Sequence, residues 1–286
     1  MVSLALATSL LWGLADFGGG LLTRRIPALT VVVVSQALAA VTLTVVVLCT
    51  SAWEAASGRL WYAVAAGLLG PLVVLCFYRA LALGPMGVVS PLVSTAVVVP
   101  VGVALLAGER PGLTQCAGIL VALAGIVLAG GPQSGGPAIQ RTTLAYTLFS
   151  AFGFGAILAL IAEASTTTEG LFLSLFVQRA CNLLAGGVAL YLGARRGTPA
   201  RPEGGWRVVT RALPALTFVG LADVLANATY VVAAGIGPVT VAAVLASLYP
   251  VVTALAARGV LRERLRGVQT AGAGLAMAGT LLLAAG

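Results

Sequence analysis

The chain of 286 residues is too apolar for a soluble globular protein, because 60% of its residues are hydrophobic and only 8% are charged. It carries 16 basic and 8 acidic side chains, a formal net charge of +8. All the basic residues are arginines and there is no histidine, which excludes lysine Schiff bases, imidazole relays and most metal sites. We expect an integral membrane protein without catalytic residues, metal or cofactor.

Several apolar runs reach the roughly 18 to 20 residues that cross a bilayer as a helix. Backbone groups cannot stay unpaired in lipid, and barrel strands would be about 10 residues long with strict alternation. The fold class is therefore predicted as an all-α membrane protein with ten transmembrane helices. The predicted helices cover residues 2–22, 29–49, 59–82, 86–107, 113–130, 142–163, 170–193, 211–234, 238–257 and 266–285.

Two stretches of the chain share one pattern, which indicates a duplicated unit. We predict a first repeat over residues 1–135 and a second over 136–286, each with five helices. An odd number of helices inverts the second copy relative to the first, an arrangement of many secondary transporters whose substrate site lies between the halves. The matching features are Gly67 and Gly220, Gly84-Pro85 and Gly237-Pro238, and Glu109-Arg110 and Glu263-Arg264.

Two acidic residues fall inside predicted spans. A carboxylate at mid-membrane costs roughly 2.5 to 3.5 kcal/mol, so Asp16 should face the bundle interior, paired or able to take up a proton. Asp223 is followed by Asn227 and Tyr230 at a spacing that places all three on one helix face. The repeat alignment matches Asp223 with Gly70 and Asp16 approximately with Ala156, so each acid occurs in one half only. We predict that these residues bind substrate or couple transport.

A second polar cluster, Gln178, Arg179 and Asn182, lies in the predicted seventh helix. Arg179 cannot lose its charge, so it needs a carboxylate partner, an anionic substrate or a route to the lipid headgroups. The repeat alignment places Ser35 and Gln36 opposite Gln178 and Arg179.

Aromatic residues supply the remaining candidates for a substrate site. We add Trp12, Tyr230 and Tyr249 to the predicted site, although aromatic side chains in membrane helices also serve packing and interfacial roles.

The arginines in the connecting loops favour one side of the membrane, and Arg59 and Arg110 lie on the other. Arginines in short loops between spans indicate topology or contact with membrane lipids and give no groove for nucleic acid. The positive-inside rule would place both termini outside the cytoplasm. The arginines of the richer side are Arg24, Arg25, Arg79, Arg141, Arg195, Arg196, Arg201, Arg207, Arg211, Arg258, Arg262, Arg264 and Arg266.

The doubled unit resembles the EamA-type ten-helix members of the drug/metabolite transporter superfamily. The resemblance rests on the two Glu-Arg endings, on Leu11-Trp12-Gly13, on Gly84-Pro85 and on Tyr249-Pro250. It implies export, and sometimes uptake or exchange, of small molecules such as amino acids and other metabolites. It also implies cytoplasmic termini, which conflicts with the arginine distribution. Small multidrug members of the superfamily have a first-helix carboxylate whose placement is similar to that of Asp16.

We therefore expect a multi-pass transporter of the cell membrane, a monomer or homodimer that moves a small metabolite, amino acid-like or drug-like, by alternating access. Export is the leading direction, and protons are the candidate coupling ion. A non-transporting scaffold or receptor and a lipid scramblase remain the alternatives. An intramembrane aspartyl protease is disfavoured because Asp223 follows Gly220, Leu221 and Ala222 and so lacks a Gly-x-Gly-Asp motif.

Overall fold

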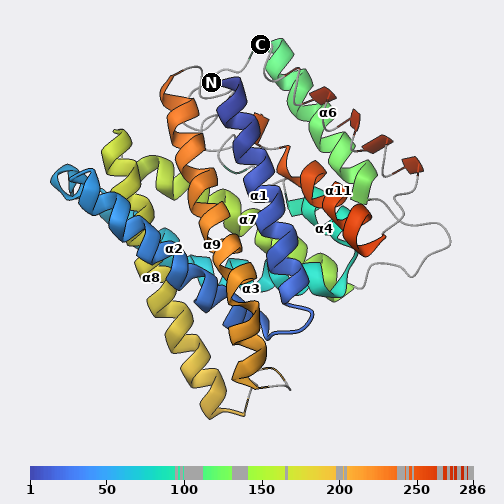
Figure 1. Ribbon diagram of the computed structural model, residues 1–286. Helices are drawn as coiled ribbons and strands as arrows, with labels where there is room; N and C mark the ends of the chain where they lie inside the picture. The colour runs from blue at the N-terminus through green and yellow to red at the C-terminus, as the bar shows by residue number, and fades with distance from the viewer. Residues whose placement is uncertain are drawn as a thin grey trace.

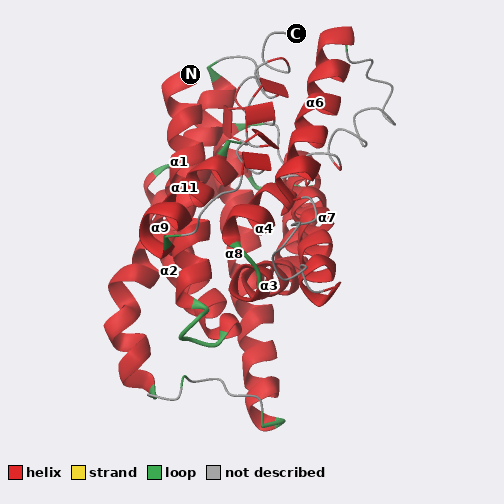
Figure 2. Ribbon diagram, turned by 90° about the vertical axis from the view of Figure 1, so that its right-hand side faces the viewer, coloured by secondary structure: helices red, strands yellow, loops and turns green. Residues whose placement is uncertain are grey.

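The computed structural model describes most of the chain as helices. The described residues are 1–93, 96, 99, 112–130, 141–164, 167–197, 202, 205–236, 242, 245–246, 248–262, 267–268, 271–272, 274–275, 278–279 and 282, and none of them forms a strand (Figures 1 and 2). The all-helical prediction is confirmed for this part of the chain. The elements are α1 (Val2–Leu22), α2 (Ala28–Cys49), the 3-10 helix η1 (Ala52–Ala55), α3 (Leu60–Leu83), α4 (Met86–Val93), α6 (Leu113–Gly130), α7 (Arg141–Ala164), α8 (Thr168–Arg195), α9 (Trp206–Gly235) and α11 (Tyr249–Leu261).

Within the described ranges, six helices are long and apolar enough to cross a membrane: α1, α2, α3, α7, α8 and α9. Three boundaries differ from the prediction by more than three residues. Helix α9 begins at Trp206 and not at residue 211. Where a helix over 238–257 was expected, α11 begins at Tyr249, after a turn at Leu248, and continues to Leu261. The count of ten helices stays a prediction, because most of 94–107, 238–248 and 263–286 lies outside the described residues, as do both Glu-Arg pairs and the boundary between 135 and 136.

Local chemistry sets several of the helix ends. Pro27 precedes α2, and α3 ends at Gly84, which has an extended backbone and is followed by Pro85, a residue with no N–H to continue the helix. Helix α8 begins after Thr167, whose hydroxyl accepts a hydrogen bond of 3.2 Å from the Gly170 N–H. These breaks separate the long helices into units that can pack side by side.

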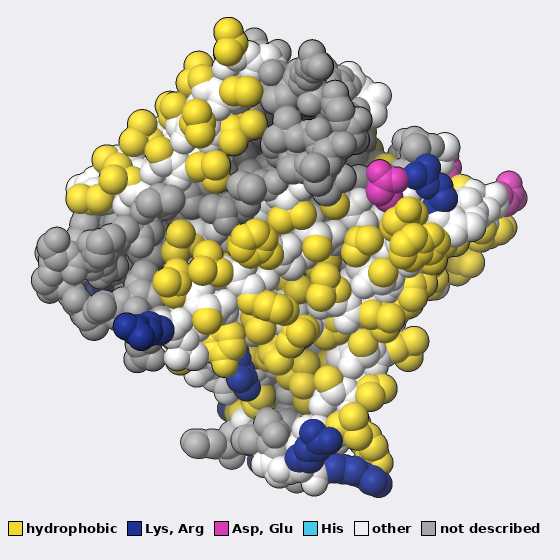
Figure 3. Space-filling view, turned by 180° about the vertical axis from the view of Figure 1, so that it is seen from behind, with side chains coloured by type: hydrophobic (Ala, Val, Ile, Leu, Met, Phe, Trp, Pro, Cys, Tyr) yellow, Lys and Arg dark blue, Asp and Glu magenta, His cyan; other side chains and the backbone are white. Residues whose placement is uncertain are grey.

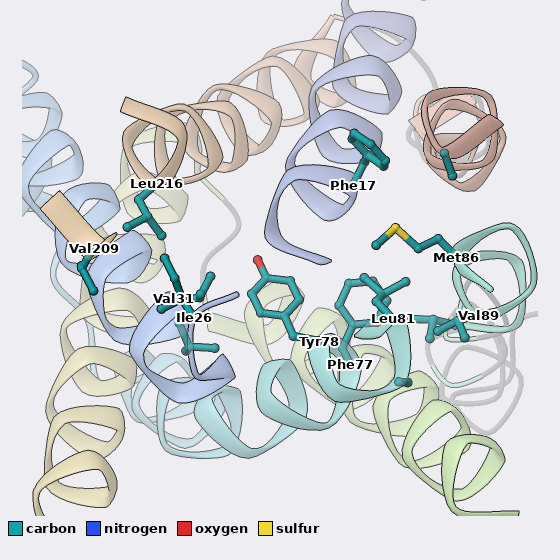
Figure 4. Packing of buried hydrophobic residues seen from close by; sticks show 14 residues of the cluster. Phe17, Ile26, Val31, Phe77, Tyr78, Leu81, Met86, Val89, Val209 and Leu216 are labelled. Carbon is teal, nitrogen blue, oxygen red and sulfur yellow. The ribbon is translucent and has the colours of Figure 1, made fainter. Parts of the chain in front are cut away.

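The molecule is apolar on its outside as well as in its core. Val41, Val45 and Leu48 lie on one face of α2 and are 56–65% exposed, and apolar side chains cover much of the surface in Figure 3. Inside, Phe77 and Leu81 of α3 are buried with other apolar side chains of the core (Figure 4). Such an exposed apolar surface is what a protein surrounded by acyl chains requires.

Helix packing follows the duplication seen in the sequence. Helix α1 packs mainly against α9, and α3 packs mainly against α7. If α1 is equivalent to α7, α2 to α8 and α3 to α9, these two contacts are copies of each other. The contact between α2 and α8 then joins two equivalent helices, so it lies on the pseudo-two-fold axis that relates the halves.

The equivalent helices α2 and α8 run in opposite directions, so the two-fold axis that relates them is roughly perpendicular to both helices. Val33 contacts Gly186, whereas Leu43, further along α2, packs with Leu175, which lies earlier in α8. These two equivalent helices are thus inverted relative to each other, as a repeat unit with an odd number of helices predicts.

Two glycines make the close contacts on either side of this axis. Gly67 of α3 lies against the main-chain carbonyl of Gln178, and Gly220 of α9 lies against that of Ser35, where a Cβ at Gly220 would be 2.6 Å from the oxygen. The repeat alignment pairs Gly67 with Gly220 and Gln178 with Ser35, so the two contacts are equivalent. They bring α3 close to α8 and α9 close to α2.

Charged side chains divide between the two ends of the helices, as Figure 3 shows from behind. The end where α1 and α8 finish and α2 and α9 begin carries Arg24, Arg25, Arg195, Arg196, Arg207 and Arg211. At the opposite end, Arg59 forms an exposed ion pair with Glu163 (2.6 Å), and Glu54 and Glu169 add negative charge.

We expect Gly67→Ala and Gly220→Ala each to lower the free energy of unfolding by about 2 kcal/mol, because the added methyl forces two helix backbones apart. Gly187→Ala is the matched control, since nothing lies within 4 Å of its Cβ position. Thermal unfolding of the purified variants in detergent measures the effect. Unchanged melting of the first two variants would contradict the close contacts.

The arginine-rich end is expected to face the cytoplasm. In a variant without native cysteines, a membrane-impermeant maleimide should label Ser57→Cys in intact cells and Arg196→Cys only after lysis. Ser57 and Arg196 are exposed at opposite ends of the molecule. The reverse labelling pattern would place both termini in the cytoplasm.

Candidate functional site

An ion pair lies in the middle of the helix bundle. Arg179 of α8 and Asp223 of α9 are 2.6 Å apart (Nη2 to Oδ2), and their side chains are only 10% and 23% exposed. A buried arginine without a carboxylate would be costly in lipid, and here the second of the two acids neutralises it. Of the three roles predicted for Arg179, the structure shows a protein carboxylate partner.

Arg179 also contacts its own repeat equivalent. Its Nη1 donates a hydrogen bond of 2.8 Å to Oε1 of Gln36 on α2. Because the repeat alignment pairs Gln36 with Arg179, this bond joins two equivalent positions where α2 crosses α8, at the pseudo-two-fold axis. Arg179 therefore ties α8 to one helix of each half.

Three buried polar atoms of α8 have no hydrogen-bond partner among the described residues: Oγ of Ser174, Nε of Arg179 and Oδ1 of Asn182. The Asn182 amide packs against Gly70, the position equivalent to Asp223. Asn182 is 2% exposed, so it forms part of the helix seam and does not line an accessible site.

Asp223, Asn227 and Tyr230 lie along one face of α9, as their spacing predicts. Asn227 donates a hydrogen bond of 2.7 Å to the main-chain carbonyl of Asp223 and lies 3.3 Å from its carboxylate Oδ1. Tyr230 lies one turn further along the same helix. Asp223 is thus held from two sides, by Arg179 and by Asn227.

Asp16 of α1 has no hydrogen bond or ion pair within the part of the chain that the structure describes, and it is partly exposed. It lies within electrostatic reach of Asp223 and of the hydroxyls of Tyr78 and Tyr249. Tyr78 of α3 is buried, and its ring end contacts Gly19 of α1. Figure 4 shows its hydroxyl directed away from Leu81.

Three aromatic rings meet beside Asp16. The Trp12 ring centroid lies 6.0 Å from that of Tyr230 on α9 and 6.2 Å from that of Tyr249 on α11, the latter edge to face. Trp12 and Asp16 are four residues apart on α1, so they share a helix face. All three aromatic side chains are partly exposed.

The backbone beside this cluster is tightly joined. The Thr253 hydroxyl of α11 donates to the Gly13 carbonyl of α1 (3.1 Å), and a Cβ at Gly13 would lie 2.6 Å from the Tyr249 carbonyl. On the other flank, the hydroxyls of Thr8 and Thr229 are 2.9 Å apart and link α1 to α9. These contacts fix the helix that carries Trp12 and Asp16.

The predicted site residues therefore fall into two groups. Asp16, Trp12, Tyr230 and Tyr249 lie near one another on α1, α9 and α11, and each is partly exposed. Arg179, Asp223 and Asn227 form the adjoining network, whereas Gln178 is buried with its carbonyl against Gly67. Sequence reasoning did not place Gln36 or Tyr78 in the predicted site; the alignment of Gln36 with Arg179 was the available signal for the first.

Two equivalent helices that cross in opposite directions, with polar and aromatic side chains beside them, are typical of membrane transporters built from inverted repeats. A model of the EamA-like transporter family matches residues 1–131 and 141–285. The chain belongs to this family of small-molecule membrane transporters, and it is a multi-pass membrane protein.

A solved structure titled "Crystal structure of protein" is similar to the chain, with a TM-score of 0.64 and 20% sequence identity over 98% of this chain and 94% of that one. The likeness supports the fold alone. No curated protein matches the chain.

Asp223→Asn should lower the free energy of unfolding by about 3 kcal/mol, because it leaves the Arg179 charge buried without a partner. Asp16→Asn should leave stability unchanged or raise it, since Asp16 has no described partner to lose. Thermal unfolding in detergent compares the two. The double variant Arg179→Met with Asp223→Leu should recover most of the loss, and equal melting of both single variants would show that Asp223 does not hold Arg179.

Proposed function

We propose that the protein is a ten-helix secondary transporter that moves a small organic metabolite by alternating access. The supporting observation is the convergence of Asp16, Trp12, Tyr230 and Tyr249 on one region between the halves. Trp12 and Asp16 come from the first half, and both tyrosines come from the second. A site shared between two inverted halves changes its access when one half tilts relative to the other.

The contacts described above suggest which parts move and which stay together. The glycine contacts at Gly67 and Gly220 and the bond between Arg179 and Gln36 all lie around the crossing of α2 and α8. Close, polar contacts of this kind favour a common pivot. Helices α1 and α11, which carry two of the three aromatic rings, lie further from that crossing and are the candidates to open and close over the substrate.

Asp16 is our candidate for the coupling group. Arg179 is occupied by Asp223 and Gln36, so no described guanidinium is left to neutralise Asp16. The groups that lie within electrostatic reach of Asp16 are Asp223, which is paired with Arg179, and the phenols of Tyr78 and Tyr249. The charge of Asp16 can therefore be compensated by a proton or by a bound cation, which allows proton release to accompany substrate binding.

The proposal predicts counterflow: proteoliposomes loaded with an unlabelled substrate should accumulate the labelled compound transiently. Candidate compounds come from a thermal-stabilisation screen of amines, amino acids, carboxylic acids and nucleosides. Asp16→Asn should abolish acceleration of transport by an imposed pH gradient, because the coupling carboxylate is gone, and should leave the melting temperature intact.

Glu163→Gln is the matched control, since Glu163 is an exposed carboxylate paired with Arg59 at the far end of the bundle. It should keep the pH-gradient response. Binding without counterflow for every stabilising compound would favour a receptor or scaffold, and movement of fluorescent phospholipid between leaflets would favour a scramblase. A gradient response that survives in Asp16→Asn would remove Asp16 as the coupling group.

A further inference from the structure

The charges at the site differ in whether they are free to meet a ligand. Arg179 uses Nη1 for Gln36 and Nη2 for Asp223, and its third nitrogen, Nε, is buried. Both ends of the guanidinium are thus engaged, so a ligand carboxylate or phosphate would have to compete with Asp223 or Gln36 for a bidentate contact. The Arg179–Asp223 pair contributes no net charge to the site.

Asp16 is the one charged group of the site without a hydrogen bond or ion pair among the described residues. The residue is partly exposed, and Asn227, an amide donor on α9, is directed to Asp223 and not to Asp16. An ionised Asp16 gives the site one uncompensated negative charge. A ligand that supplies one positive charge removes that imbalance, whereas a zwitterion brings a negative charge as well and leaves the imbalance in place.

The aromatic residues beside Asp16 favour the same ligand. Trp12, Tyr230 and Tyr249 come from three helices. The ring centroids of Tyr230 and Tyr249 lie 6.0 and 6.2 Å from that of Trp12. A cation over the face of a tryptophan or tyrosine is attracted by the ring quadrupole, and more strongly where water is excluded. A carboxylate in one place and aromatic faces one helical turn away suit an ammonium group carrying an apolar substituent.

We propose that the substrate is a small organic monocation, an aryl- or alkylammonium without a carboxylate, held by Asp16 and by the rings of Trp12, Tyr230 and Tyr249. The inference rests on the proposed function for the statement that this ligand is transported, whereas its binding can be tested independently. It selects within the wider expectation of amino acid-like or drug-like compounds, because it disfavours amino acids.

Three compounds that share a phenyl group and differ in charge test the inference: phenethylamine, phenylalanine and 3-phenylpropionate. Isothermal titration to the purified full-length protein should give at least tenfold tighter binding of phenethylamine than of either relative. Asp16→Asn should weaken phenethylamine binding at least tenfold, and Trp12→Leu should weaken it severalfold. Glu163→Gln should bind as the unchanged protein does.

Equal or tighter binding of phenylalanine or of 3-phenylpropionate would overturn the inference, as would undiminished binding of phenethylamine by an Asp16→Asn protein that melts normally. Failure of phenethylamine to bind would overturn it as well. Binding of phenethylamine without counterflow would support the cation site and contradict the transporter function. Counterflow of phenylalanine, without counterflow of phenethylamine, would support the transporter function and contradict the cation site.

Discussion

The buried charge of Arg179 constrains the whole arrangement of the helices. Arginine keeps its proton under all ordinary conditions, so a helix that carries it through lipid requires a carboxylate and further acceptors at a fixed place. Asp223 supplies the carboxylate from α9 and Gln36 supplies an acceptor from α2. Three helices from both halves are thereby fixed around one side chain, at the crossing of α2 and α8.

The backbone of the protein is nearly symmetric, and its polar side chains are not. Gly67 and Gly220 make equivalent contacts on the two sides of the axis, so both halves use one way of packing. The acids break this symmetry: Asp223 stands where the first half has Gly70, and Asp16 stands near the position of Ala156. A duplicated fold can exchange its inward and outward forms because its packing is alike in both. The acids, which have no counterpart in the other half, give one side of the axis its chemistry.

The sequence predicted the features that depend on local pattern. Continuous apolar runs placed α1, α2, α3 and α6 within about a residue of their bounds. The glycine spacing marked Gly67 and Gly220 as equivalent positions of the repeat but did not predict that they contact other helices. The start of α9 at Trp206 was missed, because the surrounding glycines, prolines and arginines have the composition of a loop. The partner of Arg179 could not be chosen between Asp16 and Asp223, since the choice depends on how α1, α8 and α9 pack and not on spacing. Gln36 could have been found, because equivalent residues that lie where two helices cross on a two-fold axis are neighbours. Gln36 and Arg179 are such a pair.

The division between a neutralised pair and a free acid determines what the site can do through a transport cycle. Because Arg179 and Asp223 cancel, the net charge of the site follows the state of Asp16. An uncompensated charge opposes closure of the helices over the site, since closure removes water and strengthens every unbalanced electrostatic interaction. A proton on Asp16 or a monocation beside it allows closure, and the two cannot occupy the same carboxylate together. Under the proposed function, this competition at one side chain is sufficient to exchange a proton for a cation, with no need for the Arg179–Asp223 pair to open.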